Sequence, residues 1–278
     1  MKLQTILTTI LLSLMLIFSV CGGSSINPQE KMNATTNNLI SIKLSISNSS
    51  LQLDADTTLN AIATYKDNTT KDVTEEVEWI SSDSNAIEII KRRLKAKKEK
   101  NVILRARLNA ITSNVVTLEI YKEINGHRLP PEPNKTLNDS TLLGIDINNN
   151  GVRDDVERWI YETYKDKHPI HIDIAMQAGR AWQKVLEDPS KAKETSLFLD
   201  AAQGCGAYYQ IYAKYFNEPI LVGEIIITKD YREKVTNTNL RRVNYWQYDT
   251  LLSGGVYNTP KIGEGKKLCD FNTSKYEE

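Results

Sequence analysis

Apolar and polar residues alternate at period two along the chain from Ile40 to Tyr121. The clearest series is Ile40, Ile42, Leu44 and Ile46; others are Val77 and Trp79; Val102, Leu104 and Ala106; and Val116, Leu118 and Ile120. Leu59, Ile62 and Tyr65 follow the alternation less strictly. Such alternation puts one face of a strand on a core and the other in water. Polar turns separate the runs. Several short strands at regular spacing predict an all-β sandwich over residues 39–122 rather than a parallel sheet.

After Asp154 the apolar residues recur at the spacing of helices, with stops at Asp188-Pro189 and at Ser253-Gly254-Gly255. The stripes are Val156, Trp159, Ile160, Thr163 and Tyr164; then Ile172, Ala175, Met176, Gly179, Trp182, Val185 and Leu186; then Phe198, Ala201, Ala202, Cys205, Tyr208, Tyr209, Tyr212, Ala213 and Phe216. A further helix is predicted from about Thr238 to Leu252. Residues 142–278 are therefore expected to form a mainly α-helical domain.

Residues 123–141 are rich in proline, which removes backbone donors and stiffens a chain. We expect a semi-rigid linker there. The chain is 278 residues long, enough for two modest domains. It is predicted to be multidomain, with an N-terminal all-β sandwich followed by the helical domain.

The N-terminal segment predicts export. Lys2 precedes an apolar run, Ile6–Val20, that is too short to span a bilayer comfortably. We interpret residues 1–20 as a signal peptide. Phe18-Ser19-Val20-Cys21 resembles a bacterial lipobox, although Leu is more usual at Phe18 and a small residue at Val20. The resemblance implies a lipid on Cys21, attachment to a lipid bilayer and, with Gly22 next, sorting to the outer membrane of the cell envelope. An ordinary secretory signal is the alternative.

Residues 21–38 are polar and lack periodicity, which is typical of a flexible tether. No later segment is long and apolar enough to span a bilayer. If Cys21 carries lipid, two cysteines remain, and an exported chain most simply pairs Cys205 with Cys269 in an oxidising compartment. The alternative is that Cys205 acts as a nucleophile, but no histidine lies near it in the sequence.

Charge gives no indication of a nucleic-acid partner, because 35 basic residues balance 35 acidic ones. The one basic run, Lys91–Lys100, falls inside the β-rich part of the chain. We expect it to form a solvated turn and sheet edge.

One stretch carries a family resemblance. Tyr65–Thr74 (YKDNTTKDVT), then Val77-Glu78-Trp79 and Ser81-Ser82-Asp83, resembles the bacterial Ig-like group 2 (Big2) domain, over about Leu39 to Lys122. The family often carries glycines where this chain has Lys91–Lys100. The resemblance implies an Ig-like sandwich used as a spacer or adhesive module. Trp79 is expected to fill the core between the two sheets.

The segment Asp146–Glu157 (DINNNGVRDDVE) fits the spacing D-x-[DN]-x-[DN]-G followed by five residues and Glu. Ca²⁺ prefers six to eight hard oxygen ligands, and this spacing wraps them round one point. The expected ligands are the side chains of Asp146, Asn148, Asn150 and Glu157, the backbone carbonyl of Val152, and Asp154 directly or through a water. The loop resembles calcium loops of EF-hand type. Because no helix precedes it, it is more similar to the single loops of dockerin and thrombospondin type 3 repeats.

Two features leave alternatives open. The loop could instead be a polar Asn-Gly turn that caps a helix, with Asp154 and Asp155 near the helix N-terminus. Arg153 also stands where paired EF-hands carry an apolar residue that joins the two loops. Separately, His168 and His171 could hold zinc, or could lie in a solvated loop.

These observations favour a non-catalytic, calcium-binding envelope lipoprotein with an adhesive or scaffolding role. Its partner would be an envelope protein or a polysaccharide. The alternative is an envelope hydrolase with its active site in the helical domain and the Ig-like domain as an accessory module. A cleft that gathers carboxylates or His171 would favour the hydrolase.

Overall fold

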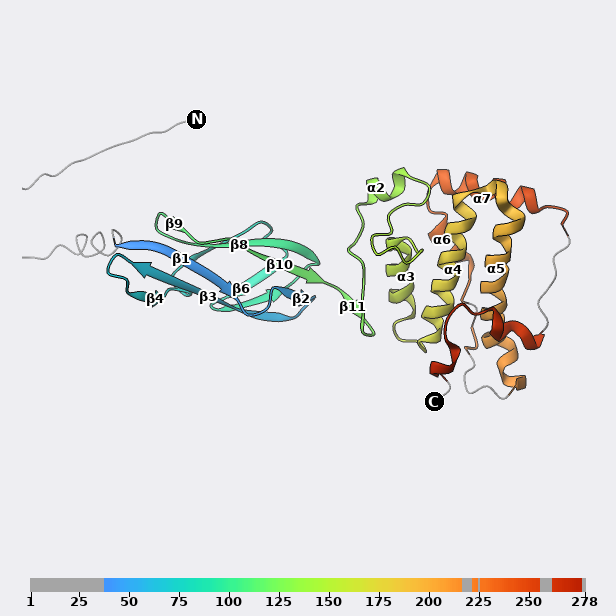
Figure 1. The fold of residues 1–278 in the computed structure, drawn as a ribbon, viewed down its shortest axis with the longest axis horizontal. Helices are drawn as coiled ribbons and strands as arrows, with labels where there is room; N and C mark the ends of the chain where they lie inside the picture. Colours follow the sequence, from blue (N-terminus) through green and yellow to red (C-terminus); the bar gives the residue numbers. More distant parts are fainter. Residues whose placement is uncertain (1–37, 217–221, 225, 256–261, 277–278) are drawn as a thin grey trace, which may run out of the picture.

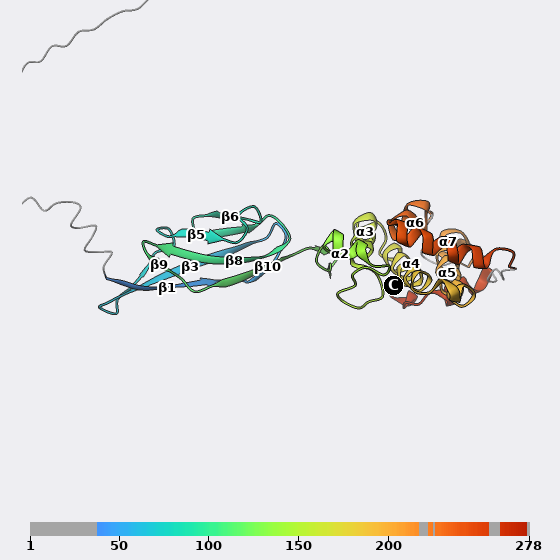
Figure 2. The same ribbon diagram turned by 90° about the horizontal axis from the view of Figure 1, so that it is seen from above.

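The computed structural model describes residues 38–216, 222–224, 226–255 and 262–276. The expected signal peptide, Cys21 and nearly all of the tether lie outside this range. A β-sheet region is followed by a helical region, as the sequence predicted, and the two lie end to end along the long axis (Figures 1 and 2). None of the helices in the described part of the chain is long and apolar enough to cross a membrane.

The β region contains two five-stranded sheets. The first sheet has the order β1 (Leu39–Ile46), β3 (Asp56–Tyr65), β7 (Arg93–Ala96) and β6 (Ile87–Ile90), with β4 (Thr70–Asp72) paired to β3. The second sheet has the order β2 (Ser50–Gln52), β10 (Val116–Tyr121), β8 (Lys100–Leu108) and β5 (Glu78–Ser81), with β9 (Ile111–Thr112) paired to β8. The pairings are antiparallel except that of β10 with β2, which is parallel.

The two sheets share one core. Leu44, Leu59 and Leu94 of the first sheet pack with Leu104 and Leu118 of the second. Trp79 is half-buried and contacts both apolar clusters of this region. The strands Val102–Ala106 and Leu118–Ile120 alternate as predicted, because their inward residues are buried and their outward ones are not.

In β1 and β3 the prediction of which residues face the core is wrong at single positions. Ile40 is 52% exposed, and Leu39 takes its place in the core. The reason is a register shift between Leu39 and Ser41 in the pairing with β3, which reverses the side-chain direction over one residue. In β3 the core positions are Ala61 and Ala63 rather than Ile62.

The basic run is not a sheet edge. It includes β7, which lies between β3 and β6 in the sheet order. Leu94 and Ala96 point inward and are fully buried, whereas Arg93 and Lys95 point outward. Leu94 and Ala96, at alternate positions, are sufficient to give this strand a buried face. The many charged residues around them led us to predict a solvated edge instead. The turn before β7 has Lys91 at a φ of 56°.

Residues 123–141 are more structured than the predicted linker. They contain a hairpin of β11 (Glu123–Ile124) and β12 (His127–Arg128), and the helix α2 (Lys135–Ser140). Asn125 and Gly126 take the positive φ values of a tight turn, which explains the hairpin. Asn134 caps α2 by accepting a hydrogen bond from the backbone N–H of Leu137 at 3.1 Å.

The helical region is built around α4. The main helices are α3 (Asp154–Tyr164), α4 (Ile170–Glu187), α5 (Ala192–Ala207), α6 (Lys229–Val235) and α7 (Asn239–Leu252). Shorter helical turns are η1 (Pro189–Lys191), η2 (Tyr208–Tyr212), η3 (Ala213–Phe216), η4 (Ile262–Leu268) and η5 (Thr273–Tyr276). The predicted last long helix is confirmed, with Thr238 as its N-cap accepting from the N–H of Arg241 at 3.2 Å.

Two aromatic residues assigned to the helical core are instead exposed, Phe198 at 43% and Phe216 at 46%. Leu199 takes the core position in α5, and Phe198 lies under the Lys184 ammonium, 4.0 Å from the ring centre. Phe216 is out of phase because η2 has the wider turn of a π-helix and η3 the tighter turn of a 3₁₀-helix.

Candidate metal centre

The expected calcium loop connects α2 to the first turn of α3. Its base is closed by the backbone, because the N–H of Asp154 donates to the carbonyl of Ile145 at 2.8 Å. The chain between these two residues wraps round the Asp146 carboxylate. That carboxylate accepts from the N–H groups of Asn150 at 3.2 Å and Gly151 at 2.9 Å.

Two residues with positive φ make this wrapping possible. Asn149 has a φ of 55° and Gly151 a φ of 81°. Asparagine and glycine are the residues that adopt this conformation most readily. The local sequence Asn149-Asn150-Gly151 therefore specifies a loop that folds back over Asp146.

Glu157 closes the loop from the first turns of α3 and is fully buried. Its Oε2 accepts from the side-chain amides of Asn148 at 3.1 Å and Asn150 at 2.7 Å. These three expected ligands thus meet at one point. A half-turn of each amide would place its oxygen at this point instead of its nitrogen. The amide oxygen is the atom that Ca²⁺ binds.

Asp154 is also buried, and its Oδ1 accepts from the N–H of Ile147 at 3.1 Å. Burial raises the pKa of Asp154 to about 6, and the carboxylates of Asp146, Glu157 and Asp155 add to the effect. Burial acts in the same direction on Glu157, but hydrogen bonds from His127, Asn150 and Asn148 outweigh it and lower the pKa of that carboxyl. Negative charge is therefore concentrated in the loop, which favours a cation.

Val152 fixes the loop to the helical core through its side chain. That side chain is fully buried against α4 at Gly179, where an added Cβ would lie 2.9 Å from Cγ1 of Val152. The hydroxyl of Tyr231 lies 3.2 Å from the same point. A side chain at position 179 would therefore displace the loop.

At position 179, the close contact with Val152 opposes the usual preference of a helix for alanine over glycine. Alanine normally stabilises a helix by about 1 kcal/mol relative to glycine. We expect Gly179→Ala to destabilise the domain by about 1–3 kcal/mol, because the added Cβ would press on the fully buried side chain of Val152. Denaturant unfolding measures the difference.

The matched control is Gly206→Ala in α5, where the nearest atom to the added Cβ is Cγ2 of Ile174 at 3.4 Å. We expect this variant to gain up to about 1 kcal/mol. Equal effects of the two substitutions would show that the Val152–Gly179 contact does not hold the loop.

Arg153 does something that the sequence did not indicate. Instead of lying in solvent beside the loop, its guanidinium is buried and pairs with Asp155. It also donates to the carbonyls of Lys234 at 3.0 Å and Val235 at 3.1 Å, at the C-terminal end of α6. The position that joins two loops in a paired EF-hand here joins one loop to a neighbouring helix.

His127 is a second residue that sequence analysis missed. It comes from β12, and its Nε2 lies 2.7 Å from Oε1 of Glu157. Its ring stacks on that of Tyr161, one turn further along α3, with ring centres 4.2 Å apart. No local signal could have found His127, because it is 30 residues from Glu157 in the sequence and only the fold brings them together.

The candidate ligands in the loop are oxygen donors, the kind of ligand that a hard cation binds. Among the described residues, no three His, Cys, Asp or Glu side chains gather closely enough to hold an ion by themselves. The loop would need the Asn148 and Asn150 amide oxygens and a backbone carbonyl to complete its shell. This oxygen-rich, partly neutral set matches the chemistry of Ca²⁺.

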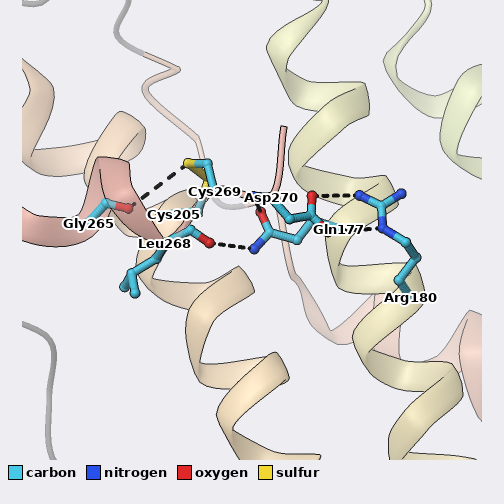
Figure 3. The surroundings of a disulfide bond; sticks show 7 residues. All are labelled: Gln177, Arg180, Cys205, Gly265, Leu268, Cys269 and Asp270. Carbon is cyan, nitrogen blue, oxygen red and sulfur yellow. Dashed lines mark hydrogen bonds and ion pairs between the residues drawn. A yellow bond between two sulfur atoms is a disulfide. The ribbon is translucent and has the colours of Figure 1, made fainter. Parts of the chain in front are cut away.

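The other candidate residues lie elsewhere. Cys205 and Cys269 form a disulfide, with their Cα atoms 5.1 Å apart (Figure 3), so Cys205 is not a free nucleophile. His168 and His171 are not a metal pair in the described structure. Nε2 of His171 faces Oε1 of Glu224 at 3.3 Å, and Nδ1 of His168 accepts from the N–H of Ile170 at 3.3 Å.

A cleft beside the hairpin has a volume of about 250 Å³ and contains the carboxylates of Glu99, Glu119 and Glu132. Each of them is paired with an arginine, Arg158 or Arg128. Their charges are therefore used in ion pairs. A wider, open groove of about 580 Å³ lies between η1 and α7, lined mainly by apolar atoms and including Trp246, which is 63% exposed.

No protein-family model matches the sequence, and no curated protein matches it.

Proposed function

We propose that this chain is a non-catalytic, calcium-binding lipoprotein of the cell envelope with a scaffolding role. The observation that carries the proposal is that the side chains of Asn148 and Asn150 meet at the buried carboxylate of Glu157. The loop that brings them together wraps round the carboxylate of Asp146. Calcium would neutralise this charge and fix the start of α3. The role of the ion is structural.

The β region would act as a spacer, an Ig-like module of the Big2 type. Support comes from the two sheets that share a core and from the position of Trp79 between the apolar clusters. The face of α7 that carries Leu240, Val243, Trp246 and Leu251 is exposed and apolar, which supports an interaction role for the helical region.

Calcium binding is tested by thermal unfolding with Glu157→Gln. The loop offers few charged ligands and has no paired loop, so we expect a Kd of about 10⁻⁴–10⁻³ M. At ten times this concentration the ion should stabilise the wild type by about 1–2 kcal/mol. Glu157→Gln should remove most of this gain. In chelator, the variant should melt somewhat lower than the wild type, because its amide cannot accept all the hydrogen bonds that the Glu157 carboxylate accepts from His127, Asn148 and Asn150. The test is therefore the rise in melting temperature that calcium causes within each protein.

The control for this experiment is Glu194→Gln, an exposed carboxylate near the start of α5. It should respond to calcium as the wild type does. If calcium does not change the melting temperature of the wild type, the calcium site is contradicted, and the loop is only a turn that caps α3.

The membrane anchor is tested at Cys21. Each buried CH₂ of an acyl chain contributes about 0.8 kcal/mol, so two or three chains attach a protein stably. Cells fed radiolabelled palmitate should label the wild type, and Cys21→Ala should abolish labelling and release the protein from the membrane fraction. Absence of label in the wild type would refute the anchor.

A further inference from the structure

The contacts between the two regions of the molecule converge on a single helix. Residues of α3 meet the β region and its hairpin through Glu157 to His127, Arg158 to Glu99 and Glu162 to Lys122. One more contact follows at the end of the helix, where the side-chain amide of Asn125 donates to the carbonyl of Lys165 at 2.9 Å. The same helix begins inside the candidate calcium loop.

Arg158 makes two hydrogen bonds to the carboxylate of Glu99 in the β region. Its NH1 and NH2 donate to the two carboxylate oxygens of Glu99, both at 2.8 Å, and the side chains are only 12% and 15% exposed. NH1 also donates to the carbonyl of Pro130 at 2.6 Å. A two-pronged pair of this kind fixes orientation as well as distance. Glu99 directly precedes β8, so this pair ties α3 to the core of the β region.

The hairpin is also attached to the β region. The guanidinium of Arg128 stacks over the Tyr121 ring at 4.2 Å and pairs with Glu119, both on β10. The N–H of Leu129 donates to the carbonyl of Lys122 at 2.9 Å. His127 is therefore held by the β region, although its side chain contacts Glu157, which closes the calcium loop.

We propose that the metal centre and the domain junction act as one thermodynamic unit, in which His127 is a positioning residue that holds Glu157 from across the junction. The proposal rests on calcium binding at the loop. With the ion bound, Glu157 and the first turns of α3 are fixed, so Arg158, Tyr161 and Glu162 face their partners in one arrangement. Without it, repulsion among the loop carboxylates loosens the start of α3 and the contacts made from it.

Coupling of this kind is reciprocal. If calcium favours the docked arrangement of the two regions, docking must raise the affinity for calcium by the same factor. A change in the β region that touches no loop residue should therefore weaken calcium binding. Hydrogen bonds that orient metal ligands typically change affinity by about 10–100-fold.

The first test is calorimetric titration of the full-length chain in detergent with CaCl₂. We expect His127→Ala to bind calcium about ten-fold more weakly and His127→Gln, which keeps a donor for Glu157, to retain most of the affinity. Glu99→Gln should weaken binding about five-fold, although Glu99 is not in the loop. The control is Glu78→Gln, which breaks the exposed pair with Arg107 on the same β region and should bind as the wild type does.

The second test measures the distance between the two regions directly, first in a chain whose junction residues are all unchanged. Spin labels at the exposed positions Ile103→Cys in β8 and Leu240→Cys in α7 report the distance between the two regions. We expect a narrow distance distribution in calcium and a broader one in chelator, and a broad one in both conditions when Glu157→Gln is added.

The outcomes separate this inference from calcium binding itself. If calcium binds but the distance distribution does not change and Glu99→Gln binds normally, the coupling is refuted and the metal site stands. If no calcium binds to the wild type, the proposed function fails and the coupling fails with it.

Discussion

Removing the disulfide should lower the free energy of unfolding of the helical region by about 4 kcal/mol. Cys205 and Cys269 are 64 residues apart in the sequence, and a cross-link over such a loop restricts the unfolded chain by about this amount. The test is denaturant unfolding of the variant with Cys205→Ser and Cys269→Ser. The wild type measured in reductant should shift in the same way.

The surroundings of the bond explain why its loss should also loosen the C-terminal segment (Figure 3). Gln177 of α4 donates to the carbonyl of Leu268 at 2.7 Å and accepts from the N–H of Asp270 at 3.3 Å. Arg180 pairs with the Asp270 carboxylate at 2.7 Å. These contacts orient the segment, but they are partly exposed and each is weak by itself.

A matched control separates the cross-link from those contacts. Gln177→Ala removes two hydrogen bonds and leaves the disulfide in place, so it should cost clearly less than the double cysteine variant. Mass spectrometry of the unreduced protein gives an independent check. Alkylation of both thiols without prior reduction would contradict the bond.

The sequence indicated the order of the two regions because periodicity is a local property. Val102, Leu104 and Ala106 need only alternate to identify an inward face. Thr238 is the N-cap of α7, and Asp154 lies in the first turn of α3, where negative charge is favourable. The loop residues could be named for the same reason, because the ligand spacing and the Asn149-Gly151 turn lie within twelve consecutive residues.

What the sequence did not indicate depends on tertiary structure. Ile40 is exposed because of a register shift set by its partner strand, and β7 is an inner strand because the distant strand β3 pairs on the side opposite β6. His127 reaches Glu157 only because the hairpin folds toward α3. In each case the deciding contact is with a residue distant in sequence, which a local pattern does not report.

The tertiary contacts of Arg153, which the sequence did not indicate, should matter most for stability. Its replacement should be among the most destabilising single changes in the chain. We expect Arg153→Met to cost about 3–5 kcal/mol, because it removes one partner of a buried pair. The variant leaves Asp155 with Lys234, at 3.0 Å, as its remaining charged partner. It also removes the donors to the carbonyls of Lys234 and Val235.

Arg153→Lys should recover only part of the loss. A lysine ammonium keeps the charge, but it lacks the planar fork that serves Asp155 and the end of α6 at the same time. The double variant Arg153→Met with Asp155→Asn should be more stable than Arg153→Met alone, since it leaves no buried carboxylate that has lost its arginine partner. Denaturant unfolding of the four proteins in the cycle gives the coupling energy.

The same variants connect stability to the metal site. Arg153 directly precedes Asp154 and fixes the end of the loop to α6, so Arg153→Met should weaken calcium binding as well as folding. Arg92→Met is the control, because Arg92 makes exposed ion pairs with Asp72 and Glu75 in the β region. It should leave both the unfolding of the helical region and the calcium affinity unchanged. An Arg153→Met variant as stable as the wild type would mean that the buried guanidinium does not hold the loop on α6.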